Sequence, residues 1–172
     1  MNVAWTCRCC GRQFDTLPID WSWARPDLWA ETPSSLRLPT SKLDSDLCRI
    51  EVGDQIHHFI RGTLDIPIVG TNDVLSWGVW SSLSKQGFQR ALELWDAEDV
   101  SGEGPRFGWL ANSLSPYPDT RSVALEVWFR SGDLRPSFRA VSPEDHPIVV
   151  EQAQGLTIER VQDYAAALMP RR

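Results

Sequence analysis

Three of the four cysteines stand within four residues near the beginning of the chain, at Cys7, Cys9 and Cys10. Cys7 and Cys10, followed by Gly11, have the spacing of a zinc knuckle, in which a tight turn brings two thiolates to one ion. Structural zinc takes four ligands, commonly from two such pairs, and the sequence holds no second Cys-x-x-Cys. The string therefore predicts half of a zinc site.

The other half of this site must come from elsewhere in the chain. Cys48 is the expected third ligand, if its strand lies beneath the N-terminal segment. The candidates for the fourth ligand carry a thiol or an imidazole: Cys9, His57, His58 and His146. Cys9 stands between the knuckle cysteines, so its side chain is expected to point away from a shared ion. Alternatively, Cys7 and Cys10 are free thiols and Cys48 is an ordinary small buried residue.

A redox pair is a further reading of Cys7 and Cys10. A thioredoxin-like site needs its first cysteine at the N-terminus of a helix that follows a strand. Gly11, Pro18 and an irregular segment follow here instead, so the sequence favours metal binding over thiol–disulfide chemistry.

A second group of residues could perform acid–base chemistry. His146 would serve as a general base and Asp145 would orient it, while guanidinium groups would hold an anion. The candidate residues, scattered along the sequence, are His146, Asp145, Arg61, Arg135 and Asp119. Such a set would suit hydrolysis or anion recognition. Alternatively, Asp145 turns the chain in a loop before Pro147, and the arginines pair with acids at strand ends.

Nine tryptophans are unusual for a chain of 172 residues. The strings WGVW (77–80) and FGWL (107–110) place glycine beside large aromatic residues, which lets a neighbouring ring cover the gap on a pleated sheet. Core packing is the first interpretation of these strings, and a stacking platform for a sugar or a base is the alternative.

The composition limits the classes of ligand. A net charge of −6 and a pI of about 5.0 argue against a nucleic-acid backbone and an anionic membrane surface as the main partner. An acidic run comprises Glu93, Asp96, Glu98, Asp99 and Glu103. It predicts a solvated surface or, alternatively, a face that binds a basic partner, as in an inhibitor or immunity protein.

The chain has no apolar run of about 18 residues and no features of a signal peptide, so we expect a protein of the reducing cytoplasm.

The elements that must position these residues follow from periodicity and from turn signals. Residues 1–45 carry prolines and tryptophans and predict an irregular arm that docks on a body formed by residues 46–172, the whole chain being one domain. Alternating or extended stretches predict strands at 46–52, 55–70, 73–84, 106–114, 121–130 and 134–141. Helical spacing predicts a middle helix at about 85–98 and a C-terminal helix at about 157–169. The order indicates an α+β fold with an antiparallel sheet of about five to seven strands and helices on one face.

Several strings occur together in one order along the chain. They are CRCCG (7–11), DLC (46–48), FIRG (59–62), WGVWSSLS (77–84), FGWL (107–110), YPDT (117–120), RPSF (135–138) and DHPIVVEQ (145–152). In this set the chain resembles the bacterial DUF2199 family, a domain of unknown function. The resemblance implies a histidine shortly after the knuckle string, and Phe14 stands at that position.

Together these observations predict an accessory or binding protein of bacterial origin that holds one structural zinc through Cys7, Cys10 and Cys48, with no other cofactor. A small enzyme or anion-binding protein that uses His146 with Arg61 and Arg135 is the alternative. An acidic inhibitor of a basic protein partner is the second alternative. The sequence contains no nucleophile-elbow, zinc-protease or phosphate-loop motif that would name a reaction.

Overall fold

The computed structural model describes residues 1–169 and contains both strands and helices, which confirms the predicted α+β class. The strands are β1 (Trp5–Thr6), β2 (Gln13–Phe14), β3 (Asp20–Ser22), β4 (Lys42–Leu43), β5 (Leu47–Val52), β6 (Gln55–Pro67), β7 (Val74–Leu83), β8 (Arg106–Trp109), β9 (Ala124–Trp128) and β10 (Ser137–Ser142). The α-helices are α1 (Asp27–Glu31), α2 (Lys85–Glu93), α3 (Pro147–Gln154) and α4 (Ile158–Leu168), with short 3₁₀ turns at Ser34–Leu36 and Thr120–Ser122.

The main sheet has eight strands within residues 1–169, in the order β3-β7-β6-β10-β9-β8, with β4 and β5 paired beside β6. It is mixed, because β10 pairs with β6 and β3 pairs with β7 in parallel. The expectation of an antiparallel sheet of five to seven strands is therefore corrected. Alternation of apolar and polar residues shows which face a strand buries, but it does not show the direction of the neighbouring strand.

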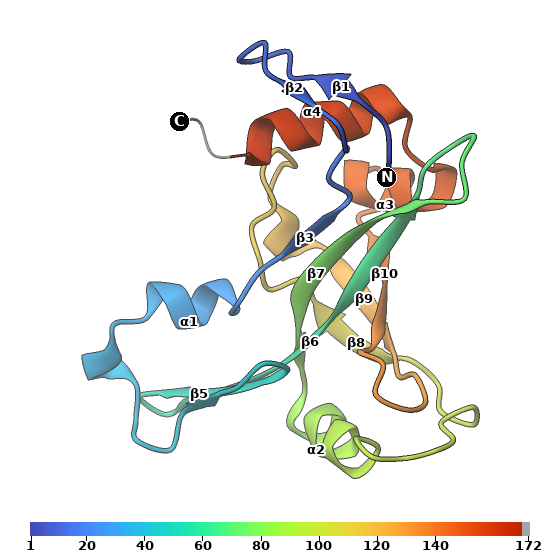
Figure 1. Cartoon of the computed structure of the whole chain (residues 1–172). Helices are drawn as coiled ribbons and strands as arrows, with labels where there is room; N and C mark the ends of the chain where they lie inside the picture. Colours follow the sequence, from blue (N-terminus) through green and yellow to red (C-terminus); the bar gives the residue numbers. More distant parts are fainter. Residues whose placement is uncertain (170–172) are drawn as a thin grey trace.

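The sheet curls until its last strand meets β7 again (Figure 1). Ser81 of β7 bridges Leu110, which follows β8, and Ala111 N–H donates to the Trp80 carbonyl at 2.8 Å. We call strands β6 to β10 the barrel. The larger core cluster joins barrel residues, including the fully buried Trp77, Leu125 and Phe138, to residues of α4 such as Tyr164.

One predicted helix agrees with the structure and two points differ. α4 begins after Thr157, whose hydroxyl accepts from Arg160 N–H, close to the predicted start. The middle helix is shorter than the predicted range and ends at Glu93, after which Trp95 and Ala97 donate to carbonyls three residues back instead of four. α3 was not predicted, because a proline that opens a helix at its first position also resembles a loop signal.

The N-terminal 45 residues contain more order than the predicted irregular arm. Within them β1 and β2 form a hairpin that lies on α4, and β3 joins the edge of the main sheet beside β7 (Figure 1). Trp21 and Trp23 are half-buried against the larger core. No helix among residues 1–169 combines the length and the apolar character needed to cross a bilayer.

Candidate metal centre

The loop between β1 and β2 holds the three clustered cysteines. Cys7 N–H donates to the Arg12 carbonyl at 2.8 Å, and Gly11 N–H donates to the Cys7 carbonyl at 2.8 Å. Gly11 has a φ of 70°, a left-handed conformation that glycine adopts without a steric penalty. These bonds close a tight turn between two antiparallel strands, which is the backbone arrangement that the knuckle spacing predicts.

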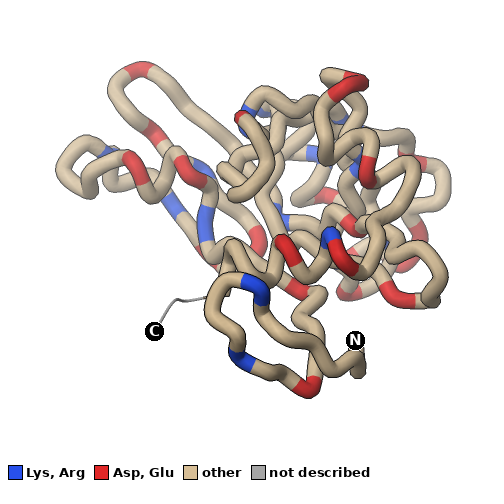
Figure 2. The backbone as a smooth tube through the Cα atoms, turned by 90° about the horizontal axis from the view of Figure 1, so that it is seen from above, with Lys and Arg blue, Asp and Glu red and all other residues tan. Residues whose placement is uncertain are grey.

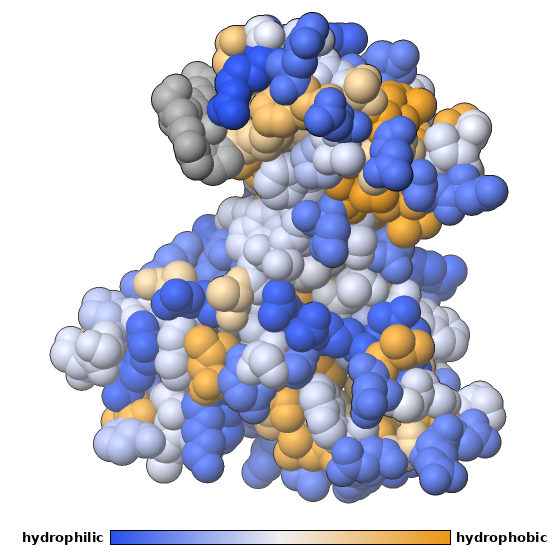
Figure 3. Space-filling model, in the orientation of Figure 1, coloured by the Kyte–Doolittle hydropathy of each residue, from blue (hydrophilic) through white to orange (hydrophobic). Residues whose placement is uncertain are grey.

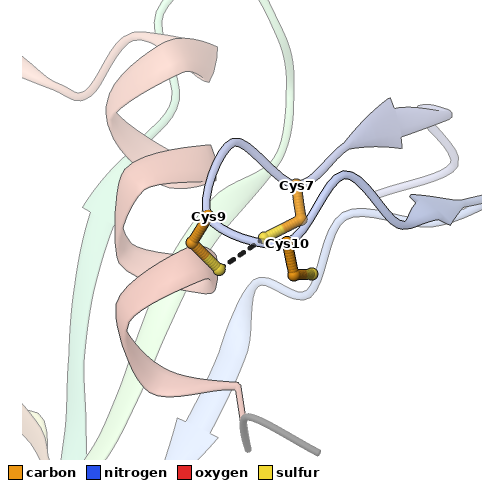
Figure 4. A group of neighbouring side chains, drawn as sticks. All are labelled: Cys7, Cys9 and Cys10. Atoms are coloured by element: carbon orange, nitrogen blue, oxygen red, sulfur yellow. Dashed lines mark hydrogen bonds between the residues drawn. The ribbon is translucent and has the colours of Figure 1, made fainter.

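The turn gathers three sulfur atoms (Figure 4). Cys7 Sγ lies 3.0 Å from Cys9 Sγ, and the sulfurs of Cys7, Cys9 and Cys10 all lie within 4.8 Å of one another. Cys7 is buried, whereas Cys9 and Cys10 are exposed. At a zinc–sulfur distance of about 2.3 Å, tetrahedral ligands stand roughly 3.8 Å apart, so three sulfurs within 4.8 Å of one another are close enough to share one ion.

The two closest thiols hold their protons with different strength. The hydrogen bond from Cys9 lowers the pKa of Cys7 to about 7, and the same contact raises the pKa of Cys9 to about 11. Cys7 is therefore partly a thiolate near neutral pH, and the thiolate is the form that binds a metal or attacks an electrophile.

The loop rests on the C-terminal helix. Cys9 Sγ lies 3.7 Å from the Ala166 carbonyl of α4, and the Arg8 guanidinium lies 3.5 Å from the Asp163 carboxylate. A ligand that fixes the conformation of the loop would therefore also stabilise its contacts with α4.

Cys48 is placed in another part of the molecule. It lies in β5, fully buried beside Ile50, Phe59 and Trp80, and burial raises the pKa of its thiol to about 12. β5 extends away from the β1–β2 hairpin, below α1 in Figure 1, and does not lie beneath the N-terminal segment. The structure does not bring Cys48 to the other cysteines. Cys9, instead of Cys48, is the third thiol beside Cys7 and Cys10.

A family model described as an uncharacterised protein conserved in bacteria (DUF2199) matches residues 6–156. The chain belongs to the DUF2199 family. No curated protein and no solved structure matches the chain. The matched range includes all three loop cysteines and ends before α4, the helix against which the loop of this DUF2199 protein packs.

The imidazoles proposed as the fourth ligand lie apart from the loop. His57 and His58 belong to the first half of β6, where they line a groove beside α2. His146 precedes α3, and its Nδ1 accepts from Ile148 N–H at 3.2 Å. Among residues 1–169, the metal-capable group comprises Cys7, Cys9 and Cys10 only.

The acid–base candidates fall into two places. Arg135 binds Asp46, and Arg61 Nη1 donates to the Ser45 carbonyl at 3.3 Å close by. Burial lowers the pKa of Arg61, and the neighbouring Arg135 lowers it further. His146 lies beyond the opposite end of β10 from Arg135, and a strand of six residues spans roughly 20 Å. The structure therefore keeps His146 away from the two arginines.

The two acidic candidates do not join either place. Asp119 precedes the 3₁₀ turn at Thr120–Ser122, and its carbonyl accepts from the Ser122 hydroxyl at 2.8 Å. Asp145 is exposed in the turn before α3. Neither carboxylate contacts the His146 imidazole in a way that would orient it.

A partly buried carboxylate cluster around Glu151 was not predicted from the sequence. Glu151 of α3 accepts hydrogen bonds from the hydroxyls of Tyr117 and Tyr164 and from Arg160 Nε, the last at 3.0 Å. Burial and the Glu151 contact raise the pKa of both tyrosines above its ordinary value, so their hydroxyls stay protonated donors. The position of Glu151 could have indicated this cluster, because Glu151 follows Ile148 by three residues in α3 and so lies on the same, buried face of the helix. Glu151 therefore links α3 to α4 through Tyr164 and Arg160, and to the loop after β8 through Tyr117.

Proposed function

We propose that this DUF2199 protein is an accessory or binding protein that holds one structural zinc ion, with Cys7, Cys9 and Cys10 as three of its four ligands and water in the fourth position. The observation that carries the proposal is the convergence of three sulfur atoms within 4.8 Å on one turn. Thiolates are the ligands that zinc prefers in structural sites, and the lowered pKa of Cys7 makes the first of them available near neutral pH.

The role of the metal follows from the place of the loop. All three ligands lie in one turn, so bound zinc would fix that turn and, through Cys9 and Arg8, its contact with α4. The hairpin contributes Trp5 and Cys7 to the core, and a β-hairpin of two short strands has little stability of its own. Zinc therefore stabilises the packing of the β1–β2 hairpin on α4. A reducing, cytoplasmic location is part of the proposal, because the thiols must stay reduced to bind metal.

The experiment that tests the proposal is a titration of the reduced protein with cobalt(II), a spectroscopic substitute for zinc. Thiolate ligation produces an intense sulfur-to-cobalt charge-transfer band in the near ultraviolet. We expect one equivalent of cobalt to saturate this band and zinc to abolish it. A Cys9→Ser variant should lose about a third of the intensity and bind more weakly, because one of three sulfurs is removed.

Cys48→Ala is the matched control for the cobalt titration. It also removes one thiol, but from the buried cluster around Trp80, and should leave the band unchanged. Equal loss of the band in both variants, or no band in the wild-type protein, would contradict the proposal.

A further inference from the structure

A groove of about 1060 Å³ opens at the end of the barrel near α2. The first half of β6, the end of β7, α2 and β8 form its walls. This volume lies at the upper end of pockets for single small ligands and suits a short stretch of polypeptide. The groove exists because β7 leaves the sheet after Leu83 to enter α2, while β6 and β8 extend past that point on either side.

At the edge of β8 that faces this groove, the backbone groups of Phe107 have no partner strand. Leu110 N–H donates to Val123 O at 2.9 Å, whereas Trp109 N–H donates away from β9 to the Ser82 hydroxyl at 3.0 Å. Because adjacent residues of an antiparallel strand direct their peptide groups to opposite sides, Phe107 directs its N–H and C=O away from β9 as Trp109 does. A strand placed in the groove could pair with Phe107.

Apolar side chains stand exposed along the groove. Phe107 is 60% exposed and Trp109 is 47% exposed, and their rings contact edge to face at a centroid distance of 5.2 Å. Ile56 on the opposite wall is 50% exposed. Figure 3 shows a mostly hydrophilic face with several apolar patches, the broadest toward the upper right. Exposed aromatic residues beside an open strand edge are typical of a binding surface.

The groove carries positive charge in a chain whose net charge is −6. Its walls include Lys85, Arg90 and Arg106 but only one carboxylate, that of Glu93, and they also include His57 and His58. Arg90 pairs with both Glu93 and Glu103, and Arg106 pairs with Glu103. Lys85 forms no ion pair within residues 1–169, so the unpaired positive charge of the groove comes from Lys85. Figure 2 shows acidic and basic positions interspersed over the molecule.

We propose that this groove binds an extended acidic peptide, which adds to the edge of β8 as a further strand. Backbone hydrogen bonds to Phe107 would give register, and Phe107 and Trp109 would take alternate apolar side chains. The acidic side chains would face Lys85 and the two histidines. The partner is then a protein with an exposed acidic, extended segment, and the zinc loop takes no part in its recognition.

Fluorescently labelled, acetylated heptapeptides that alternate glutamate with valine are suitable probes. We expect saturable binding by fluorescence anisotropy at low salt, with slower hydrogen exchange at the Phe107 amide in the complex. A heptapeptide that alternates lysine with valine should bind at least tenfold more weakly, because its charge matches that of the groove. N-methylation of alternate amides in the acidic peptide, which blocks strand pairing and keeps the charge, should also abolish binding.

The chain offers a matched pair of lysine variants for this experiment. Lys85→Glu should weaken binding about tenfold, whereas Lys42→Glu, in β4 outside the groove, should change it less than twofold. Equal binding of the N-methylated peptide, equal loss in both variants, or no saturable binding would overturn the proposal. Tighter binding of a labelled single-stranded oligonucleotide than of the peptide, or dimerisation of the chain through β8, would also overturn it by assigning the groove to another occupant.

Discussion

Replacing Gly108 with alanine tests the closure of the barrel between β7 and β8. A β-carbon at Gly108 would lie 2.2 Å from the Ser82 carbonyl oxygen and 2.2 Å from the Ser81 hydroxyl oxygen. Ordinary van der Waals contact begins near 3.4 Å, so the seam between the strands would have to open by about 1.2 Å at this point. The Ser82 oxygen belongs to the backbone, so no side-chain rotation relieves the contact.

Overpacking of this kind costs typically about 1–3 kcal/mol. Because backbone must move here, we expect the free energy of unfolding to fall by about 2–3 kcal/mol, which lowers the melting temperature by about 4–12 °C in a chain of this size. Urea unfolding followed by circular dichroism measures the free energy, and calorimetry measures the melting temperature.

Two controls make this prediction specific. Gly102→Ala, in the loop before β8, adds the same methyl group where no atom lies within 4 Å, and should change the melting temperature by less than about 2 °C. Ser81→Ala added to Gly108→Ala should restore little, since the clash with the Ser82 carbonyl remains. A Gly108→Ala variant as stable as the wild-type protein would refute the closure of the barrel and the groove that depends on it.

Two further predictions concern the partly buried side chains of Glu151 and His58. Glu151→Ala removes the acceptor of two tyrosine hydroxyls and should destabilise the protein by about 2–4 kcal/mol in urea, while Glu151→Gln, which keeps one acceptor oxygen, should cost clearly less; equal losses would contradict the assigned hydrogen bonds. Burial first, and then the nearby Arg49 and Lys85, lower the pKa of His58 below its ordinary value, so its contribution to stability is complete above about pH 6.5 and is lost as the pH falls through the folded-state pKa. His58→Gln should therefore lose less stability than the wild-type protein between about pH 7 and pH 5, and parallel losses would show that His58 does not titrate in this way.

The class of the fold was predictable from the sequence because the longer strands and helices show the periodic alternation of apolar and polar side chains that each element type requires. Alternation across residues 46–52 corresponds to β5, and the apolar stripe after Thr157 corresponds to α4 with its hydroxyl cap. Strand direction was not predictable, because parallel and antiparallel neighbours bury the same alternating face. α3 was missed because Pro147 after His146 is compatible with both a loop and a helix start.

The candidate site was only half predictable for a similar reason. The knuckle spacing identified the turn, but the direction of Cys9 depends on the conformation of an irregular loop, which has no repeating period to read. Cys48 was placed in the site on the assumption that β5 underlies the N-terminal segment. The long β6 carries its partner β5 away from the hairpin instead, so that Cys48 packs on Phe59 and Trp80.

The most direct test of the zinc proposal is native mass spectrometry of the reduced protein, purified without chelator. We expect a mass excess of one zinc ion that is retained in Cys48→Ala and present at clearly lower occupancy in Cys9→Ser, which binds the metal more weakly. A metal-free mass for the wild-type protein supplied with zinc, or a zinc ion that survives Cys9→Ser and disappears in Cys48→Ala, would contradict it.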